Sequence, residues 1–579
     1  MLRKHLPLVL LASCAPAAAG TVTVNAGDDP ARDKSMFNSA PASSINLSYS
    51  VARADDHATH EHHADSAEPL GTVHFANTCA PSQSAAFDRA VALLHSFGYE
   101  RAENAFSAVA SADPKCAMAY WGVAMSNFHP IWGPPSPAEF ERGQAAARKA
   151  RDVVSADVRE RAWVDAIGAF YIENAPRPHP ERVQAFAAAM AKVAAAYPDE
   201  DEAQIFNALA ILGVAYNSKP DKTYARQKEA HAILQRQLAS HPQHPGVAHY
   251  MIHSFDYPEL APLALDAAHA YARIAPASPH ALHMPSHIFT RLGLWHDSIA
   301  SNKAAAATSE RLVHEAHPGA TGFDGLHAMD YLEYAYLQIA DDDNAKAIVE
   351  RVAQATSFDA PTPTAGYALA PVPARYALER RAWKEAAGLT PQPSTFPWDK
   401  APQTEAIVHF ARAVGAARSG DGATARAAIE RLSAIETALR DQPGFDWATQ
   451  VKVQRLAAAG WLAYAEKNND EALARLNEAA DLEDTTDKHP VTPGAVLPAR
   501  EQLADLLREL KQPRLALAAY ERSLQDAPAR YNSLLGAAEA AHEAGDGRRE
   551  HELRTQLAKL CAGSSSARAR LAGKGDGGN

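Results

Sequence analysis

The chain has 579 residues, of which 47% are hydrophobic and 21% are charged, and its formal net charge is −12. Such a length is too great for one hydrophobic core, so we expect about three to five domain-sized units or one long repeat array. The acidic balance argues against a nucleic-acid partner, because no basic stripe is available for phosphate groups. Alanine is frequent in nearly every segment and β-branched clusters are few, which predicts an all-α fold.

The first 20 residues have the pattern of an export signal. Arg3 and Lys4 precede a short apolar core,. Leu11-Ala12-Ser13-Cys14 resembles a bacterial lipobox, which would attach a lipid to Cys14, whereas Ala17-Ala18-Ala19 suits ordinary signal cleavage. No other stretch approaches the roughly 18–20 apolar residues that a membrane span needs. We therefore expect an exported bacterial protein, periplasmic or anchored in the cell envelope by that lipid alone.

Residues 21–72 lack a helical period and are rich in Ser, Ala, Asp and Asn, which predicts a disordered linker,. The run from Asp55 to Asp65 contains His57, His60, His62 and His63. Such a run can hold a metal ion loosely. A solvated linker without that role is the alternative.

The cysteines leave two possibilities open. Outside the cytoplasm Cys79 and Cys116 could form a disulfide, or they could be two small buried thiols,. Cys561 would be left without a partner in the first case,.

The helical period covers two long segments, 73–357 and 405–561,. Between them, residues 358–404 are interrupted by prolines and glycines, which predicts a spacer between two arrays,. Residues 562–579 carry Ser, Gly and scattered basic residues and predict a disordered tail,.

Small, aromatic and proline residues recur at fixed offsets in these two segments. The copies include Ala102, Phe106 and Pro114; Leu456, Ala459, Gly460, Ala463, Ala472, Leu476 and Ala479; and Leu503, Ala504, Leu507, Ala516, Tyr520 and Pro528. In this pattern the chain resembles the tetratricopeptide-repeat (TPR) family over most of residues 75–560, which implies a solenoid of helix-turn-helix units. The phrases CAMAYW, PHALHMPSHIF and HPVTPGAVLPAR are also similar to a group of bacterial envelope repeat proteins with no established activity.

Two histidine pairs repeat at the period of this solenoid. His283 and His287 follow His249 and His253 at one common interval, which matches the TPR period of about 34 residues. Residues four apart share a helix face, so stacked repeats would bring the four imidazoles to one patch. The resemblance implies that these positions face the concave groove.

Pro285 leaves two outcomes open for the second pair. A helix beginning at Pro285 would separate His283 from His287,. A helix beginning at Pro279 would instead have to accommodate Pro285 as a kink,.

A partial copy of the surrounding motif extends the candidate site. His253-x-x-Asp256-Tyr257 recurs as His327-x-x-Asp330-Tyr331. A carboxylate three residues from an imidazole can orient it or share its metal. The predicted ligands of a transition metal (Zn, Cu, Fe or Ni) are therefore His249, His253, His283, His287, His327 and Asp330,.

Other side chains are predicted to line the groove. They are Tyr250, Asp256, Tyr257, Tyr331, His95, His129 and Trp132. His95 and His129 are separated by the same interval as the histidine pairs, which fits either an aromatic packing layer or a second ligand-binding patch.

Three functions agree with this pattern. The first is an exported scaffold whose groove binds a peptide or protein partner. The second is a transition-metal-binding protein that uses the histidine cluster. The third is a metal-dependent hydrolase or oxidase, for which Tyr250 stands where a zincin carries its glutamate,. No nucleophile elbow, Walker loop, dinucleotide fingerprint or Cys-x-x-Cys is present in the sequence,, so nothing in it requires catalysis.

Overall fold

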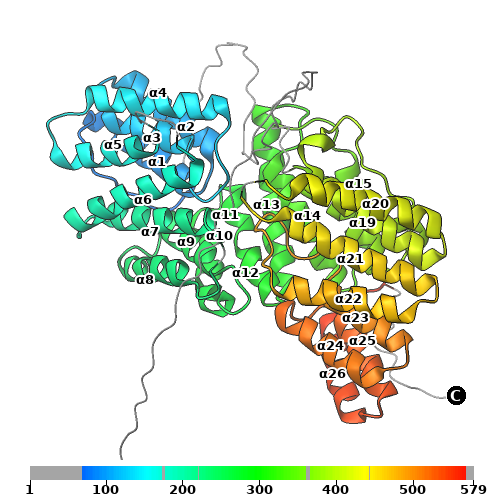
Figure 1. Ribbon diagram of the computed structural model, residues 1–579. Coiled ribbons are helices and arrows are strands. Elements are labelled where there is room, and N and C mark those ends of the chain that lie inside the picture. The colour runs from blue at the N-terminus through cyan, green and yellow to red at the C-terminus, as the bar shows by residue number, and fades with distance from the viewer. Residues whose placement is uncertain are drawn as a thin grey trace, which may run out of the picture. The chain divides into compact units, whose positions relative to one another are not determined.

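A computed structural model describes residues 68–171, 177–219, 221–359, 365–442, 444–566 and 568. The predicted export signal, Cys14, the histidine run 57–63 and the tail beyond Arg568 lie outside these residues. Within them every regular element is a helix, so the predicted all-α helical-repeat fold is confirmed (Figure 1). No described helix is both long enough and apolar enough to cross a membrane.

The helices follow one another along the chain in antiparallel repeats. The N-terminal helices are α1 (Ser84–His95), α2 (Tyr99–Ala112), α3 (Ala117–Ser126), α4 (Pro137–Val153), α5 (Val158–Tyr171), α6 (His179–Ala196), α7 (Asp201–Tyr216) and α8 (Ala225–Ser240), with a short 3₁₀ turn η1 (Pro81–Gln83) before them. The central helices are α9 (Pro245–Phe255), α10 (Leu265–Ile274), α11 (Pro279–His283), α12 (Pro285–Arg291), α13 (Trp295–Ala316), α14 (Phe323–Gln338), α15 (Asp342–Ala353), α16 (Gly366–Leu369), α17 (Pro371–Glu379) and α18 (Trp383–Ala387), with η2 (Ala261–Ala264) between α9 and α10. The C-terminal helices, after η4 (Trp398–Lys400), are α19 (Pro402–Ser419), α20 (Gly422–Leu439), α21 (Trp447–Ala465), α22 (Asn469–Asp484), α23 (Ala499–Glu509), α24 (Pro513–Asp526), α25 (Tyr531–Glu543) and α26 (Gly547–Leu560).

Close packing between successive helices depends on the small and aromatic residues of the repeat pattern. Ala102 and Phe106 on α2 are fully buried, and the Phe106 ring lies where a side chain at Gly122 of α3 would be, 2.3 Å from an added Cβ. Tyr520 of α24 occupies the same kind of space against Gly536 of α25. The helices therefore approach each other at positions where one partner has no side chain.

The segment predicted as a spacer contributes to the core instead. Helices α16 to α18 lie within residues 358–404, and Tyr367, Val372 and Phe396 are all buried. The prolines that suggested irregular structure are compatible with a helix here, because Pro371 and Pro373 occupy the first turn of α17, where no backbone N–H is needed,.

A few residues of the predicted linker and of the predicted tail make contacts with the repeats. The backbone N–H of Thr72 donates to the carbonyl of Gln243 at 2.9 Å, and Leu70 is buried. At the other end Ser564 donates to the carbonyl of Ala340 at 2.7 Å, and the Arg568 guanidinium bonds Asp342 at 2.9 Å. Leu70, Thr72, Ser564 and Arg568 are thus held by the folded part of the chain, the last three through residues far away in the sequence.

A disulfide joins Cys79 to Cys116, with Cα atoms 4.6 Å apart. It ties the segment before α1 to the N-cap of α3 and decides between the two possibilities that the sequence left open. Cys561 is a free, buried thiol.

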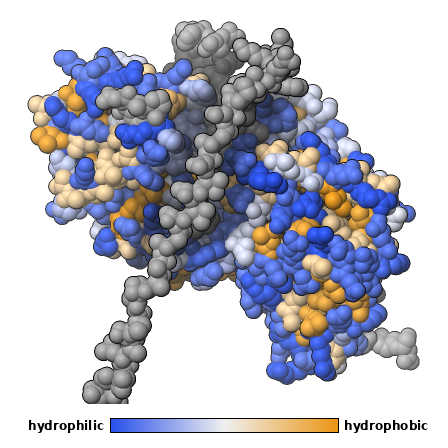
Figure 2. Space-filling model, in the orientation of Figure 1, coloured by the Kyte–Doolittle hydropathy of each residue, from blue (hydrophilic) through white to orange (hydrophobic). Residues whose placement is uncertain are grey.

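The face of the molecule seen in Figure 2 is mainly hydrophilic, with hydrophobic residues in separate small patches.

Candidate metal centre

Four helices bring the repeated histidines together. The first pair lies on α9, the second pair on α11 and α12, and His327 lies on α14. Helices α10 and α13 separate them in sequence, so the pairs occupy equivalent positions of neighbouring helix-turn-helix units. Stacking of the units therefore places imidazoles from different repeats in one buried cluster.

A third imidazole, from the following helix-turn-helix unit, completes each pair as a triad. In the first triad, formed by His249, His253 and His280, one ring nitrogen from each residue lies within 4.8 Å of the others. The Nε2 atom of His249 is 3.0 Å from those of both His253 and His280. His249 and His253 are buried, and His280 is half-buried.

The second triad has the same composition. It consists of His283, His287 and His327, whose ring nitrogens also lie within 4.8 Å of one another. The Nε2 atoms of His283 and His287 are 3.0 Å apart, and the ring centroids of His283 and His327 are 4.3 Å apart. All three side chains are buried.

Neighbouring acceptors hold three of these rings by their other nitrogen. The Nδ1–H of His249 donates to the carbonyl oxygen of His95 at 2.6 Å. That of His283 donates to Asn302 Oδ1 at 2.7 Å, and that of His287 donates to Asp256 Oδ2 at 2.9 Å. The Asn302 amide is oriented by its own donation to the Ser298 carbonyl, which leaves Oδ1 free to accept,.

These bonds fix the tautomers of the second pair. Because both His283 and His287 carry their proton on Nδ1, both Nε2 atoms present a lone pair to each other across 3.0 Å,. Two facing lone pairs repel unless a proton or another cation lies between them. Burial and the neighbouring rings decide whether a proton or a metal ion is favoured there.

Protonation is the less favourable solution. Burial, followed by the neighbouring imidazoles, lowers the pKa of His249, His253, His280, His283 and His327 well below 6.5. Burial also lowers the pKa of His287, although its hydrogen bond to Asp256 opposes this shift. The rings are neutral at physiological pH, which is the state that binds a metal ion.

Two charged groups, Asp256 and Lys488, lie behind the second triad, and only Asp256 was among the predicted site residues. Asp256 was expected to orient His253, three residues before it, but its carboxylate bonds His287 of the next helix. The same carboxylate accepts from Arg291 Nε at 2.8 Å and lies 3.3 Å from Lys488 Nζ. Lys488 belongs to the loop between α22 and α23, far from Asp256 in the sequence, so no local spacing could have indicated it.

His280 also was missed, although a local signal existed. It lies three residues before His283, so the two share a helix face with His287,. His283 and His287 share a helix face in spite of Pro285, because Pro279 begins α11 and Met284 keeps helical backbone angles of φ −52° and ψ −37°. The chain thus continues through Pro285 and presents all three rings on one side.

Asp330 requires a correction. It was predicted to share the metal with His327, but its side chain is buried against Arg375, with Oδ1 at 2.6 Å from Nη1. Arg375 lies on α17 in the former spacer and also approaches Glu333 at 3.2 Å. A buried guanidinium is the stronger partner for a carboxylate than a neutral ring.

His95 belongs to a separate hydrogen-bonded cluster. Its Nε2–H and that of His244 donate to the two oxygens of Glu202, each at 2.9 Å, and the Tyr250 hydroxyl lies 2.9 Å from His95 Nδ1. Burial opposes ionisation of Glu202, but His95 and His244 lower its pKa well below 4.5. We interpret this cluster as a support for the first triad, because the His95 carbonyl holds His249.

The other predicted groove residues divide between the site and its surroundings. The ring of Trp132 packs at 6.0 Å from that of His253, and the ring of Tyr331 at 4.9 Å from that of His287. His129 lies apart, with its Nε2 bonded to the Ser126 carbonyl. Tyr257 accepts a hydrogen bond from Gln227 at 3.1 Å and also lies outside the triads.

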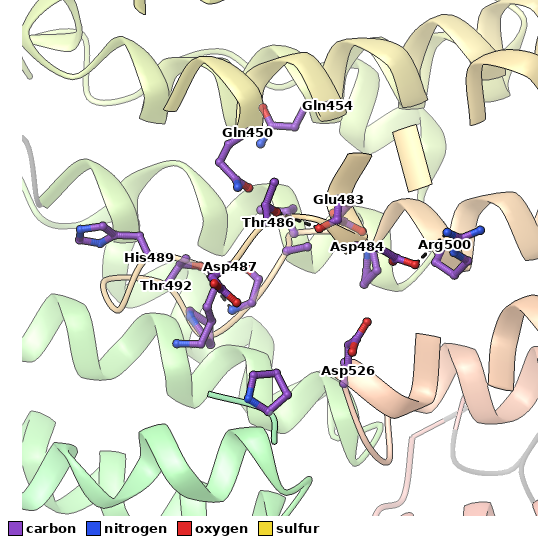
Figure 3. A pocket seen from close by; sticks show the side chains of 18 of the residues that line it. Gln450, Gln454, Glu483, Asp484, Thr486, Asp487, His489, Thr492, Arg500 and Asp526 are labelled. Atoms are coloured by element: carbon purple, nitrogen blue, oxygen red, sulfur yellow. Dashed lines mark hydrogen bonds and ion pairs between the residues drawn. The ribbon is translucent and has the colours of Figure 1, made fainter. Parts of the chain in front are cut away.

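A pocket of about 260 Å³ shares two residues with the support of the second triad (Figure 3). Arg291 and Lys488 line the pocket and also bond Asp256. In Figure 3 Gln450 and Gln454 extend from α21 toward Thr486, while Glu483, Asp484 and Asp487 follow the chain from the end of α22.

Fold and site together define an all-α helical-repeat protein with two histidine triads, in which five of the six rings belong to buried residues. No family model matches the sequence, and no curated protein does. Among solved structures the chain is similar to the human IFIT1 dimer with m7Gppp-AAAA, at 13% identity and a TM-score of 0.37, over 77% of this chain and 90% of that one. It is also similar to the P58(IPK) TPR domain, at 11% identity and a TM-score of 0.20, over 81% of this chain and 99% of that one. Such low values say nothing about activity or ligand.

Proposed function

We propose that this chain is a metal-binding protein that holds two transition-metal ions, one in each histidine triad. The observation that carries the proposal is the pair of Nε2 lone pairs of His283 and His287, which face each other at 3.0 Å in a buried site. A metal ion within about 2.0–2.1 Å of each nitrogen removes that repulsion. Neutral imidazole suits Zn, Cu, Fe and Ni.

The hydrogen bonds behind the rings support the same proposal. A metal-binding histidine typically donates its other N–H to a carboxylate, a carbonyl or a similar acceptor. The carbonyl of His95, Asn302 and Asp256 supply such acceptors to three of the six rings. Rings held in this way lose little conformational entropy when a metal binds, because their orientation is already fixed.

Metal content of untagged protein tests the proposal. After equilibration with Zn²⁺, with Cu²⁺ or, without oxygen, with Cu(I), followed by dialysis, elemental analysis is expected to find two ions per chain for at least one of these metals. His253→Ala and His287→Ala should each remove one ion, and the double variant should remove both. The control is the double variant His296→Ala, His551→Ala, which changes two exposed histidines. Equal metal content in the triad variants and the control would overturn the proposal.

A groove that binds a peptide at these histidines is the weaker alternative. His249, His253, His283 and His287 are each at most 2% exposed, so a peptide could not reach them without opening the helices. The Cys79–Cys116 disulfide supports export to an oxidising compartment,. We retain export, with or without a lipid anchor, as part of the proposal.

The pocket in Figure 3 is a second candidate site for a peptide or protein partner. Among the described residues, Gln403 Nε2 and Trp447 Nε1 have no hydrogen-bond partner, and both residues line this pocket. Both donor atoms are buried in the wall of the pocket, so a peptide must widen the pocket to reach them. Such donors then suit the carbonyl oxygens of an extended chain. Affinity-selection mass spectrometry with a random hexapeptide library tests the idea: enriched peptides should disappear with Gln403→Ala, and no enrichment by the intact protein would exclude it.

A further inference from the structure

The two triads lie against each other as well as within themselves. The rings of His253 and His287 have centroids 6.4 Å apart, and those of His280 and His283 are 6.5 Å apart. These separations are close to the 6.3 Å between His253 and His280 inside the first triad. Ions held by the two triads would therefore be neighbours, as in sites where two metals share one small ligand.

The charge of the surroundings restricts which ions fit. All six ligands are neutral imidazoles, and no carboxylate is among the described residues of either triad. The nearest charged groups beside the second triad are one carboxylate, Asp256, and two cations, Arg291 and Lys488. Two divalent ions would add four positive charges to this buried site without any negative ligand, which is costly at low dielectric.

Monovalent copper satisfies the two requirements of this site, a small added charge and a preference for neutral imidazole ligands. Cu(I) adds half the charge of a divalent ion, and imidazole is a suitable ligand for copper. An increase in oxidation state then requires an anion between the two ions, so that the total charge of the buried site does not change.

We infer that the site holds a pair of copper ions that binds dioxygen between them; this inference rests on the metal-binding function proposed above. Each Cu(I) gives one electron and becomes Cu(II), and dioxygen accepts both electrons and remains as a bridging dianion. No proton is taken up and no bond to a protein atom breaks. The total charge of metals and bridge is +2 before and after the step, so the binding of dioxygen adds no charge to the buried site.

The half-buried His280 gives a route for a small ligand. It is the most exposed of the six rings and belongs to the seam between the triads. The other five rings are covered by packed side chains, including Phe97, whose ring lies 4.3 Å from that of His249. A small ligand that reaches the two ions would therefore enter beside His280, whereas a bulky substrate would require the helices to move.

Anaerobic loading with Cu(I), followed by exposure to air, tests the inference on the full chain. We expect two copper ions per chain, uptake of one dioxygen per pair, and a Cu(II) EPR signal far weaker than the copper content, because spins joined by one bridge are coupled. His280→Gln and His327→Gln each leave one triad intact and should bind one copper whose oxidised form gives its full EPR intensity. His296→Gln serves as the unchanged control.

The outcomes separate the two proposals. Two bound copper ions with full, independent EPR intensity in the unaltered protein would overturn the copper-pair inference and leave metal binding in place. Displacement of Cu(I) by equimolar Zn²⁺ would also overturn it. Failure to bind any metal would overturn the proposed function itself.

Discussion

At the residue scale, hydrogen-bond acceptors behind the rings fix the tautomers of the histidines. An isolated imidazole chooses its tautomer freely, but His283 and His287 have that choice removed by Asn302 and Asp256,. Asp256 also bonds Arg291 and lies near Lys488, so its negative charge offsets cations that would otherwise repel a metal ion. Burial lowers the pKa of Lys488 to about 8, although Asp256 opposes this shift.

Substitution Asp256→Asn tests this role. The amide can still accept from His287, but it carries no charge and leaves Arg291 and Lys488 uncompensated. Loss of such a partner typically weakens metal affinity about 10–100-fold. Competitive titration with a metal chelator should show this loss at the second triad and an unchanged affinity at the first. An equal loss at both triads would mean that the substitution disturbs the fold.

His129, a buried histidine outside the candidate metal centre, provides a pH test. Burial lowers the pKa of His129 to about 4 from 6.5, although its bond to the Ser126 carbonyl opposes the shift. The unfolded chain therefore binds a proton more readily than the folded one between these values. The free energy of unfolding should fall as pH is lowered from about 6.5 to about 4, by up to about 3 kcal/mol from this residue.

Substitution His129→Asn should reduce that pH dependence, because asparagine binds no proton in this range. Asparagine also tolerates the positive φ of 52° at this position, so the backbone is kept,. Urea unfolding of metal-free protein at several pH values measures it. His296→Asn, at an exposed position, should keep the original slope.

At the scale of elements, the spacing of helices α1 and α9 positions the first triad. Gly246 in the first turn of α9 permits the approach, because an added Cβ would lie 2.4 Å from Nδ1 of His95 on α1. The His95 carbonyl in turn accepts from His249. The first triad therefore depends on a contact between helices that are far apart in the sequence.

Substitution Gly246→Ala should move His95 and thereby loosen His249. We expect a loss of about 1–3 kcal/mol in the free energy of unfolding of metal-free protein, as for other overpacked positions, and weaker metal binding at the first triad. Gly547→Ala is the matched control, because nothing lies within 4 Å of an added Cβ there. Equal stabilities of the two variants would show that α1 and α9 adjust without cost.

At the scale of the whole molecule, long-range contacts join the central helices to the C-terminal ones. The loop between α22 and α23 brings Lys488 to Asp256, and the Tyr331 hydroxyl donates to the carbonyl of Pro490 in that loop at 2.9 Å. Arg530 at the start of α25 bonds Glu379 of α17 at 2.7 Å, fully buried. The central and C-terminal helices are thus joined through charged groups as well as through apolar packing.

The disulfide should stabilise the N-terminal part of this structure. It closes a loop with a sequence separation of 37 residues, for which loop entropy gives about 4 kcal/mol as an upper value,. The double variant Cys79→Ser, Cys116→Ser should unfold at lower urea concentration than the unaltered protein. Reduction with dithiothreitol should lower the urea midpoint of the unaltered protein to that of the double variant and leave the midpoint of the double variant unchanged.

The sequence by itself determined the fold class and the register of the histidine pairs. Alanine content, the repeat pattern and the common interval between the pairs are local or periodic features, and helix geometry converts them directly into a shared face,. The placement of Asp330 beside Arg375, the pairing of Asp256 with His287, and the arrival of Lys488 were decided only by tertiary structure. Each of these depends on which distant charge a buried carboxylate meets, and a buried charge selects its partner by proximity in space rather than by spacing along the chain.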